Sequence, residues 1–299
     1  MRPDISVILA SYGQKETILK TVKSIYSQKT KHEYEVIIID SSPENLYRFV
    51  KKNYPKIRGK WLPRQTGQSP ARTMGAEMAK ADKLVYCDTD TILEKDVLEK
   101  SYNALNEHEV VSFGAENANP ESLVGQAIFL TEFTGFLCEY PARNTTDYMG
   151  FGVAFNKKIL GKYGYFIDQE NSQDLIHGWL LTKKGVQIFF DSGIKVYHIN
   201  RTKFKDAFKV QYGIGRTSCR TRKRMLLPKN TIMKYPFLIP LLPFYRSISI
   251  AAKLLRYARK KLLIFILVYP LAFALLVGYT AGFFYERFFG EKQERLFAE

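Results

Sequence analysis

The stretch Glu35-Val-Ile-Ile-Ile-Asp40 is a near-continuous run of β-branched residues that ends in an acid. Such a run is typical of a strand that is buried on both faces, as in a parallel sheet. Similar apolar runs lie at residues 5–10, 84–87, 110–113 and 151–155. Helical spacing of apolar residues predicts helices at 16–28, 68–81, 95–106 and 121–139. This alternation predicts an α/β fold with a doubly wound, mostly parallel sheet flanked by helices.

The composition is that of a folded protein. Of 299 residues, 46% are hydrophobic and 25% are charged, which excludes a disordered chain. The cysteines Cys87, Cys138 and Cys219 are an odd number at wide spacings. They match neither a disulfide framework nor a paired metal-ligand pattern, so we expect a reducing compartment.

The positive charge is concentrated in one part of the chain. Residues 1–194 hold 24 Lys and Arg against 24 Asp and Glu. Residues 195–261 hold 18 basic residues against the single acid Asp206, and residues 262–299 have a net charge of −1. A basic block of this kind usually meets phosphate, in nucleic acid, in lipid headgroups or in a substrate.

An apolar segment follows the basic block. Residues 262–284 carry no charge over 23 positions, and a helix of that length covers about 35 Å, enough to cross a hydrocarbon core of about 30 Å. We therefore predict a transmembrane helix at 262–284 and an interfacial segment at 236–252. The basic residues then face an anionic membrane surface, on the cytosolic side, in preference to nucleic acid.

Polar residues follow the predicted strands directly, at Ser11-Tyr12-Gly13, Asp40-Ser41-Ser42 and Asp88-Thr89-Asp90. In open α/β sheets, ligands bind outside the carboxyl ends of the strands. Two carboxylates two residues apart, as in Asp88 and Asp90, suit Mg²⁺ or Mn²⁺ with positions left for phosphate oxygens. The other interpretation is a pair of solvated carboxylates that cap the next element.

Three motifs in this order resemble the inverting family 2 glycosyltransferases of the GT-A fold. The first strand reads Ser6-Val-Ile-Leu-Ala-Ser-Tyr-Gly13, and the second ends in Asp40-Ser41-Ser42. The segment Gly67-Gln-Ser-Pro-Ala-Arg-Thr-Met-Gly75 then precedes the Asp88-x-Asp90 strand. The resemblance covers residues 4 to about 215.

The resemblance implies a donor site for a nucleotide diphosphate sugar of the UDP or GDP type. Ser11 and Tyr12 belong to it, Asp40 would recognise the base and Asp88 the ribose side. Asp90 would be the principal metal ligand. The donor-site residues implied in this way are Ser11, Tyr12, Asp40, Arg72, Asp88 and Arg216. The family's second Asp is Ser41 here and its Asn after Arg72 is Thr73, which leaves the nucleotide open.

The family also has a Glu-Asp pair at the start of a helix, whose Asp deprotonates the acceptor. The matching residues here are Gln173 and Asp174. Asp174 is therefore the candidate base, with Glu170 or Asp168 as its substitute. The other interpretation is an Asp that only caps the helix.

Two further residues are implied by the resemblance. His198 ends the strand-like run 195–198 and stands where relatives hold a metal or diphosphate. Arg216 would contact the diphosphate from a segment that closes over it, with the cluster of residues 220–224 facing lipid headgroups.

We therefore expect a catalytic domain at 1–230, a basic interfacial segment at 231–261, the membrane helix at 262–284 and a polar tail at 285–299. The expected activity is an inverting, metal-dependent transfer of sugar to a lipid-linked or membrane-delivered acceptor, namely a glycan, a glycolipid or polyprenyl phosphate. Two alternatives are a nucleotidyltransferase and a catalytically silent module that binds membranes or anionic polymers. Donor hydrolysis with and without Mn²⁺ distinguishes them.

Overall fold

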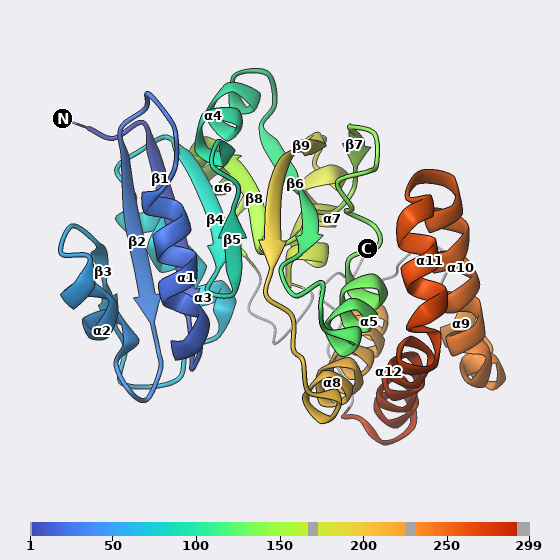
Figure 1. The fold of residues 1–299 in the computed structure, drawn as a ribbon. Coiled ribbons are helices and arrows are strands. Elements are labelled where there is room, and N and C mark those ends of the chain that lie inside the picture. The colour runs from blue at the N-terminus through green and yellow to red at the C-terminus, as the bar shows by residue number, and fades with distance from the viewer. Residues whose placement is uncertain (1, 167–172, 225–230, 292–299) are drawn as a thin grey trace. The chain divides into compact units, whose positions relative to one another are not determined.

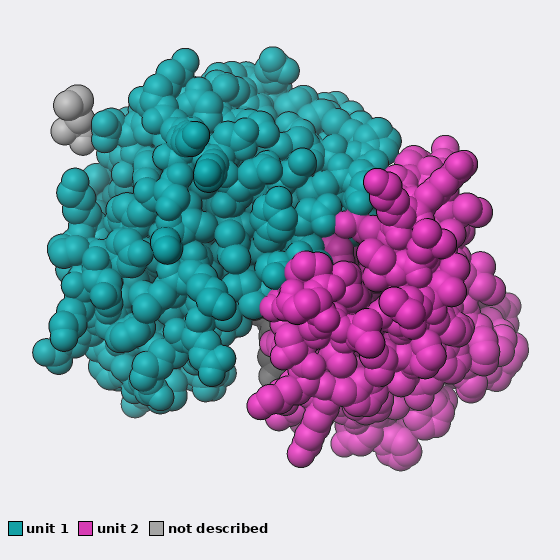
Figure 2. All heavy atoms as spheres, viewed as in Figure 1, with its two compact units in different colours: residues 1–118, 136–199 teal, residues 119–135, 200–299 magenta. Residues whose placement is uncertain are grey.

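The computed structural model describes residues 2–166, 173–224 and 231–291 (Figure 1). The chain forms two compact units (Figure 2). Unit 1 comprises residues 1–118 and 136–199, and unit 2 comprises residues 119–135 and 200–299. The sequence-based boundary at residue 230 differs from this division, because the helix at 204–224 packs with the C-terminal helices.

Unit 1 is built on one mixed sheet. Among the described residues it has nine strands in the order β3-β2-β1-β4-β8-β6-β9-β5, with β7 paired to β9. The strands are β1 (Ile5–Ser11), β2 (Tyr34–Asp40), β3 (Arg58–Trp61), β4 (Lys83–Asp88), β5 (Thr91–Leu93), β6 (Val110–Asn117), β7 (Arg143–Thr145), β8 (Gly152–Asn156) and β9 (Ile188–His198). The predicted α/β fold is confirmed. The sheet is parallel from β3 to β4 and mixed beyond, because β8 runs antiparallel to both of its neighbours.

Helices flank this sheet (Figure 1). They are α1 (Lys15–Tyr26), α2 (Leu46–Asn53), α3 (Gln68–Met78), α4 (Val97–Glu107), α6 (Lys157–Tyr163) and α7 (Gln173–Lys183). The helix α3 lies unusually close to β1, since a Cβ added at Gly75 would be 2.3 Å from Ile8 Cγ2. This glycine therefore sets how the segment before the Asp88-x-Asp90 strand packs on the sheet.

The register brings three strand ends together. Ser11 lies opposite Asp40 on one side, and Ala10 lies opposite Asp88 on the other. Consequently the polar turns that follow β1, β2 and β4 share one edge of the sheet, where the sequence predicts the ligand site.

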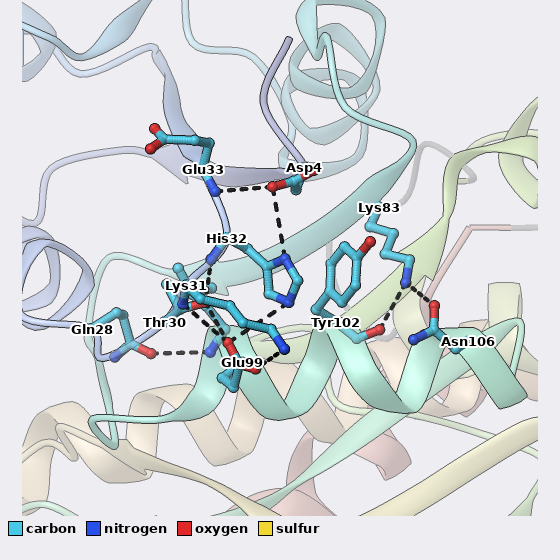
Figure 3. Close-up of polar contacts among 11 residues, drawn as sticks. Asp4, Gln28, Thr30, Lys31, His32, Glu33, Lys83, Glu99, Tyr102 and Asn106 are labelled. Atoms are coloured by element: carbon cyan, nitrogen blue, oxygen red, sulfur yellow. Dashed lines mark hydrogen bonds and ion pairs between the residues drawn. The ribbon is translucent and has the colours of Figure 1, made fainter. Parts of the chain in front are cut away.

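A polar cluster closes the opposite edge, where β1, β2 and β4 begin (Figure 3). His32 lies 3.7 Å from a carboxylate oxygen of Asp4 and 3.7 Å from one of Glu99. Its ring also stacks on Tyr102 of α4, with centroids 3.5 Å apart. The backbone N–H of Glu33 donates to Asp4. These contacts join α4 to the strand starts and leave the other edge free for ligands.

The predicted helix at 121–139 is wrong in its second half. Helix α5 (Leu123–Glu132) ends at Phe133. Beyond it, the Phe136 carbonyl accepts from Ala115 N at 2.7 Å, and Leu137 forms a parallel bridge with Ala115. The chain therefore leaves the helix to pair beside β6, a long-range contact that local periodicity does not encode.

Unit 2 is helical. Besides α5 it contains α8 (Phe204–Arg224), α9 (Thr231–Lys234), the 3₁₀-helix η1 (Pro236–Leu241), α10 (Leu242–Tyr257), α11 (Arg259–Leu267) and α12 (Tyr269–Phe289). The backbones of α8 and α12 lie in contact at two glycines. A Cβ added at Gly215 would be 1.9 Å from the Tyr279 carbonyl oxygen, and a Cβ added at Gly282 would be 2.0 Å from the Tyr212 carbonyl oxygen.

The prediction of one continuous helix at 262–284 is wrong. The chain breaks at Val268, and α11 and α12 meet at an angle of 81°. Pro270 explains the break, because it has no N–H to donate and its ring interferes with the carbonyl four residues earlier. By length and composition, Pro236–Tyr257 is the one helix among the described residues that suffices to cross a membrane by itself, and α11 and α12 together pass the same test as a bent pair. Pro236–Tyr257 contains the segment predicted to be interfacial.

Candidate active site

The turns after β1 and β2 are tied together by hydrogen bonds. The carboxylate of Asp40 accepts from Ser42 N at 3.0 Å, from Ser42 Oγ at 2.5 Å and from Tyr47 N at 2.9 Å. Ser42 Oγ in turn accepts from the backbone N–H of Gly13 at 2.7 Å. The Asp40 side chain is completely buried. A direct contact with a base would need this turn to open, so that role stays a prediction.

A pocket of about 150 Å³ opens between these turns and β4. Ser11 is buried in its wall and Tyr12 is 47% exposed at its rim. The Oγ of Ser11 has no hydrogen-bond partner in the described structure, so it is available to a ligand. The pocket is lined by Ala10, Ser11, Tyr12, Gln14, Thr66, Gln68, Ala71, Asp88 and Thr89.

Arg72 and Asp88 form a buried ion pair beside this pocket. The Nη2 of Arg72 lies 2.7 Å from Asp88 Oδ1 and also donates to the Gly150 carbonyl at 2.8 Å. Burial acts to lower the pKa of Arg72, but the carboxylates of Asp88 and Asp174 outweigh it and raise that pKa. Gly150 permits this contact, because a Cβ there would be 2.7 Å from the guanidinium. Arg72 therefore holds the start of the Asp88-x-Asp90 turn in place.

Asp174 lies in the first turn of α7, as the sequence predicts, and joins the same network. Its Oδ2 accepts from Gly150 N at 3.0 Å and its Oδ1 from Leu175 N at 2.9 Å. Burial raises the pKa of Asp174, against the lowering effect of Arg72 and of the two backbone N–H groups. A half-buried carboxylate with a raised pKa is the type of group that can take a proton from an acceptor. The substitute bases Glu170 and Asp168 lie outside the described residues.

A second arm of hydrogen bonds closes a ring that sequence reasoning missed. The side-chain amide of Gln173 donates to Gln68, and Gln68 Nε2 donates to Asp88 Oδ1 at 2.8 Å. Hydrogen bonds thus join Asp88, Arg72, Gly150 and Asp174 on one side and Asp88, Gln68 and Gln173 on the other, and the peptide bond between Gln173 and Asp174 closes the ring. Gln68 could have been found from its place in the Gly67–Gly75 motif, whereas Gly150 carries no local signal.

His177 and Tyr148 form a second hydrogen-bonded group, which links α7 to the segment before Gly150. Tyr148 Oη lies 2.7 Å from His177 Nδ1, and His177 Nε2 lies 3.2 Å from the Gly164 carbonyl. The carbonyl can only accept, so Nε2 carries the proton and Nδ1 accepts from the tyrosine. Burial lowers the pKa of His177 to about 4. A neutral imidazole therefore anchors α7 to the segment before Gly150.

Asp90 follows the pocket-lining residues Asp88 and Thr89 and lies beside His198. The backbone N–H of Ile199 donates to the Asp90 carbonyl at 2.8 Å, and His198 Nε2 lies 3.7 Å from Asp90 Oδ1. Gln14 holds the turn, because it donates to Asp90 Oδ2 at 3.1 Å and accepts from Thr89 Oγ1. One carboxylate and one imidazole suit Mn²⁺ chemically. No set of three or more His, Cys, Asp or Glu able to hold a metal is found among the described residues, so further ligands would come from the substrate and water.

The remaining predicted residue, Arg216, belongs to α8 in unit 2. Its Nε lies 3.0 Å from Glu286 Oε2, within the same unit. A diphosphate contact would have to compete with this ion pair. That role remains a prediction.

The fold and the site place the chain among α/β proteins whose ligands bind at the carboxyl ends of the strands. The family described as "Glycosyl transferase family 2" matches residues 6–178, more than half of the sequence. The chain therefore belongs to glycosyl transferase family 2, as the motifs predict.

Curated relatives share part of the sequence. The chain is 32% identical over 127 residues to the poly(ribitol-phosphate) β-N-acetylglucosaminyltransferase TarP of Staphylococcus aureus, covering 41% of this chain and 36% of TarP. It is 31% identical over 110 residues to the putative teichuronic acid biosynthesis glycosyltransferase TuaG of Bacillus subtilis, covering 36% and 43%. It is 26% identical over 211 residues to a poly-β-1,6-N-acetyl-D-glucosamine synthase of S. aureus, covering 64% and 50%. The chain thus spans half or less of these relatives.

Solved structures share the fold. The structure of S. aureus TarS 1-349 matches with a TM-score of 0.51 and 14% identity, over 95% of this chain and 91% of that one. The structure of GalNAc-T7 with UDP, GalNAc and Mn²⁺ matches with a TM-score of 0.53 and 15% identity, over 67% and 44%. These likenesses confirm the GT-A-type fold of the chain.

Proposed function

We propose that this chain is an inverting glycosyltransferase that moves a sugar from a nucleotide diphosphate sugar to a glycan acceptor of the cell envelope. The observation that carries the proposal is the closed ring through Arg72, Asp88, Gly150 and Asp174, with Gln173 and Gln68 completing it. The ring couples the predicted donor residue Asp88 to the predicted base Asp174. Both carboxylates raise the pKa of Arg72, so one buried guanidinium couples them electrostatically.

In the proposed mechanism, the pocket at Ser11, Tyr12 and Asp88 holds the nucleotide. Asp90 and His198 would hold a divalent cation, Mn²⁺ or Mg²⁺, whose charge would offset that of the diphosphate. Arg72 keeps Asp88 in place and, as a neighbouring cation, favours the ionised form of Asp174. Asp174 then accepts the proton of the acceptor hydroxyl.

The names of the relatives support the choice of acceptor. They include enzymes of poly(ribitol-phosphate), teichuronic acid and poly-N-acetylglucosamine synthesis. We propose a UDP- or GDP-sugar donor and an acceptor of this polymeric class, lipid-linked or delivered at a membrane. The basic, apolar C-terminal helices support a site on the membrane, with the catalytic unit on the cytosolic face.

The decisive test compares Asp174→Asn with the wild-type chain. We expect transfer to fall by about 10²–10⁴-fold, because the base acts only when the acceptor hydroxyl loses its proton. Binding of donor plus Mn²⁺, measured calorimetrically, should stay within about twofold. Asp82→Asn is the matched control, since Asp82 is an exposed acid of unit 1 paired with Arg2.

Asp90→Asn should instead abolish the Mn²⁺ dependence of donor binding, because it removes the charge that holds the cation. Wild-type donor affinity in this variant would refute the metal assignment. Full transfer by Asp174→Asn would refute the base. Donor binding without hydrolysis or transfer by the wild-type chain would favour the silent module.

A further inference from the structure

Helix α10 carries apolar residues on its exposed side. Leu241 at the end of η1 and Phe244, Ile248 and Leu255 of α10 are spaced three, four and seven residues apart and are 54–69% exposed. This spacing puts them on one face of the helix. The opposite face is buried within unit 2, at Pro243, Ser247, Ile250 and Leu254. Water-soluble helices normally place polar residues on such an outer face.

Helix α12 repeats this arrangement. Val277, Phe284 and Phe288 are 42–51% exposed, again at helical spacing, while Leu275, Tyr279 and other residues of the opposite face are buried. A groove of about 630 Å³ lies between the two outer faces, with walls from η1, α10, α12 and Tyr212 of α8. The Thr280 hydroxyl in this groove donates a hydrogen bond to the Leu276 carbonyl at 2.8 Å. A hydrocarbon chain bound in the groove would therefore not leave this hydroxyl without a partner.

Basic residues border the outer apolar face. Lys253, Arg256, Arg259 and Lys260 are all exposed, in the last turns of α10 and the first turn of α11. Cations beside an exposed apolar face suit the headgroups and acyl chains of an anionic bilayer, where each contributes about 1 kcal/mol.

The helices are nevertheless unsuited to crossing. Helix α11 has nine residues and covers about 14 Å, less than half of a hydrocarbon core. Helix α12 is long enough, but it is locked to α8 at Gly215 and Gly282. Since α8 carries cations from Lys205 to Arg224, a crossing α12 would take them into hydrocarbon at about 2.5–3.5 kcal/mol each.

Helix α10 is bound to the same assembly. Its Phe244 packs on Phe273 of α12 with ring centroids 5.2 Å apart. Arg246 donates to the Thr131 carbonyl of α5 at 3.1 Å and lies 4.0 Å from the ring centroid of Tyr279. If α10 crossed the membrane, it would therefore either lose its contacts with α12 or carry α12 and the attached α8 into the membrane with it.

We infer that unit 2 lies in the plane of one leaflet of an anionic membrane, that its described helices do not cross the bilayer, and that acyl chains fill the groove between η1, α10 and α12. This replaces the spanning helix expected at 262–284. It concerns the mode of membrane attachment and does not depend on the proposed catalytic residues.

The test of topology uses three added cysteines, one per variant of the full chain, at exposed positions: Lys234→Cys before η1 and α10, Lys260→Cys in the first turn of α11, and Glu291→Cys after α12. Each variant is expressed, and inverted membrane vesicles and spheroplasts are treated with a membrane-impermeant maleimide. All three cysteines should react in the same one of the two preparations. The parent chain, with Cys87 and Cys219 buried and Cys138 partly exposed, gives the baseline that is subtracted. Labelling of any two of the three cysteines from opposite sides would demonstrate a crossing and overturn the inference.

The groove is tested with Phe284→Trp in vesicles of phosphatidylcholine and phosphatidylglycerol with brominated acyl chains. Bromine quenches tryptophan on contact, so we expect fluorescence to fall at least twofold more than in the parent, whose Trp61 and Trp179 lie in unit 1. Lys209→Trp, on exposed α8 surface, is the control and should resemble the parent. Equal quenching of both variants would refute occupation of the groove.

Discussion

The two units of this protein both bury charged groups but differ in how much apolar surface they expose. Unit 1 buries its strands together with Asp40 and Arg72, and its exposed large apolar side chains among the described residues are Tyr12, Trp61 and Leu175. Unit 2 completely buries Glu286, with Arg216 Nε at 3.0 Å and Arg220 Nε at 2.9 Å from its carboxylate, and leaves Phe237 and Leu263 70% or more exposed. Since apolar surface goes where it avoids water, this difference indicates that the two units have adapted to different surroundings.

The largest expected effect comes from breaking the buried charges of unit 2. Glu286→Ala leaves the guanidinium groups of Arg216 and Arg220 without their carboxylate, which costs about 3–5 kcal/mol for a buried pair. We expect the unfolding transition of unit 2 in detergent micelles to move to lower temperature while donor binding by unit 1 persists. Glu291→Ala, an exposed acid of the same unit, is the control. An unchanged transition in Glu286→Ala would mean that the ion pairs contribute nothing to the packing of α12 on α8.

A pH effect should follow from the buried imidazole of unit 1. The pKa of His177 is lowered to about 4 from an ordinary value of 6.5, so the unfolded chain takes up a proton at a higher pH than the folded chain. Stability is therefore fully present above pH 6.5 and falls as the pH drops toward 4, by roughly 3 kcal/mol. Urea unfolding at about pH 7.5, 6 and 5 measures this slope.

His177→Gln should be less stable than the wild-type chain at neutral pH but should lose less stability on acidification, because the titrating group is gone. Tyr148→Phe is the matched variant, since it removes a hydrogen bond of His177 and keeps the imidazole. It should retain the acid-induced loss. Parallel pH profiles in the wild-type chain and His177→Gln would exclude the histidine as the source.

The smallest expected effect concerns the packing of α3 on β1. In Gly75→Ala the added Cβ would be 2.3 Å from Ile8 Cγ2, and overpacking of this kind costs about 1–3 kcal/mol. Unit 1 should lose that stability and some donor affinity, because α3 carries Gln68 and Arg72. Gly161→Ala in α6 is the control, since nothing lies within 4 Å of its added Cβ. Equal stability of both variants would show that α3 shifts without cost.

Most of unit 1 was predictable because its signals are local. The apolar runs predicted β1, β2, β4, β6 and β8, and the acids at their ends predicted which edge of the sheet carries the site. The motifs at residues 6–13, 40–42 and 67–75, in this order before the Asp88-x-Asp90 strand, were sufficient to indicate the family. The short strands β3, β5 and β7 escaped prediction, because they have three or four residues each and depend on pairing partners far along the chain.

The sequence by itself determined the α/β class, the acidic strand ends and the placement of basic and apolar residues in the C-terminal third, because periodicity and charge are properties of neighbouring residues. Only the tertiary structure decided that Gln68 and Gln173 bridge Asp88 to the turn of Asp174. It also decided that the chain bends by 81° at Val268 and that α12 is held against a charged helix. The Gln68–Gln173 and Arg216–Glu286 contacts join residues 105 and 70 positions apart, and no local pattern specifies which distant partner a side chain meets.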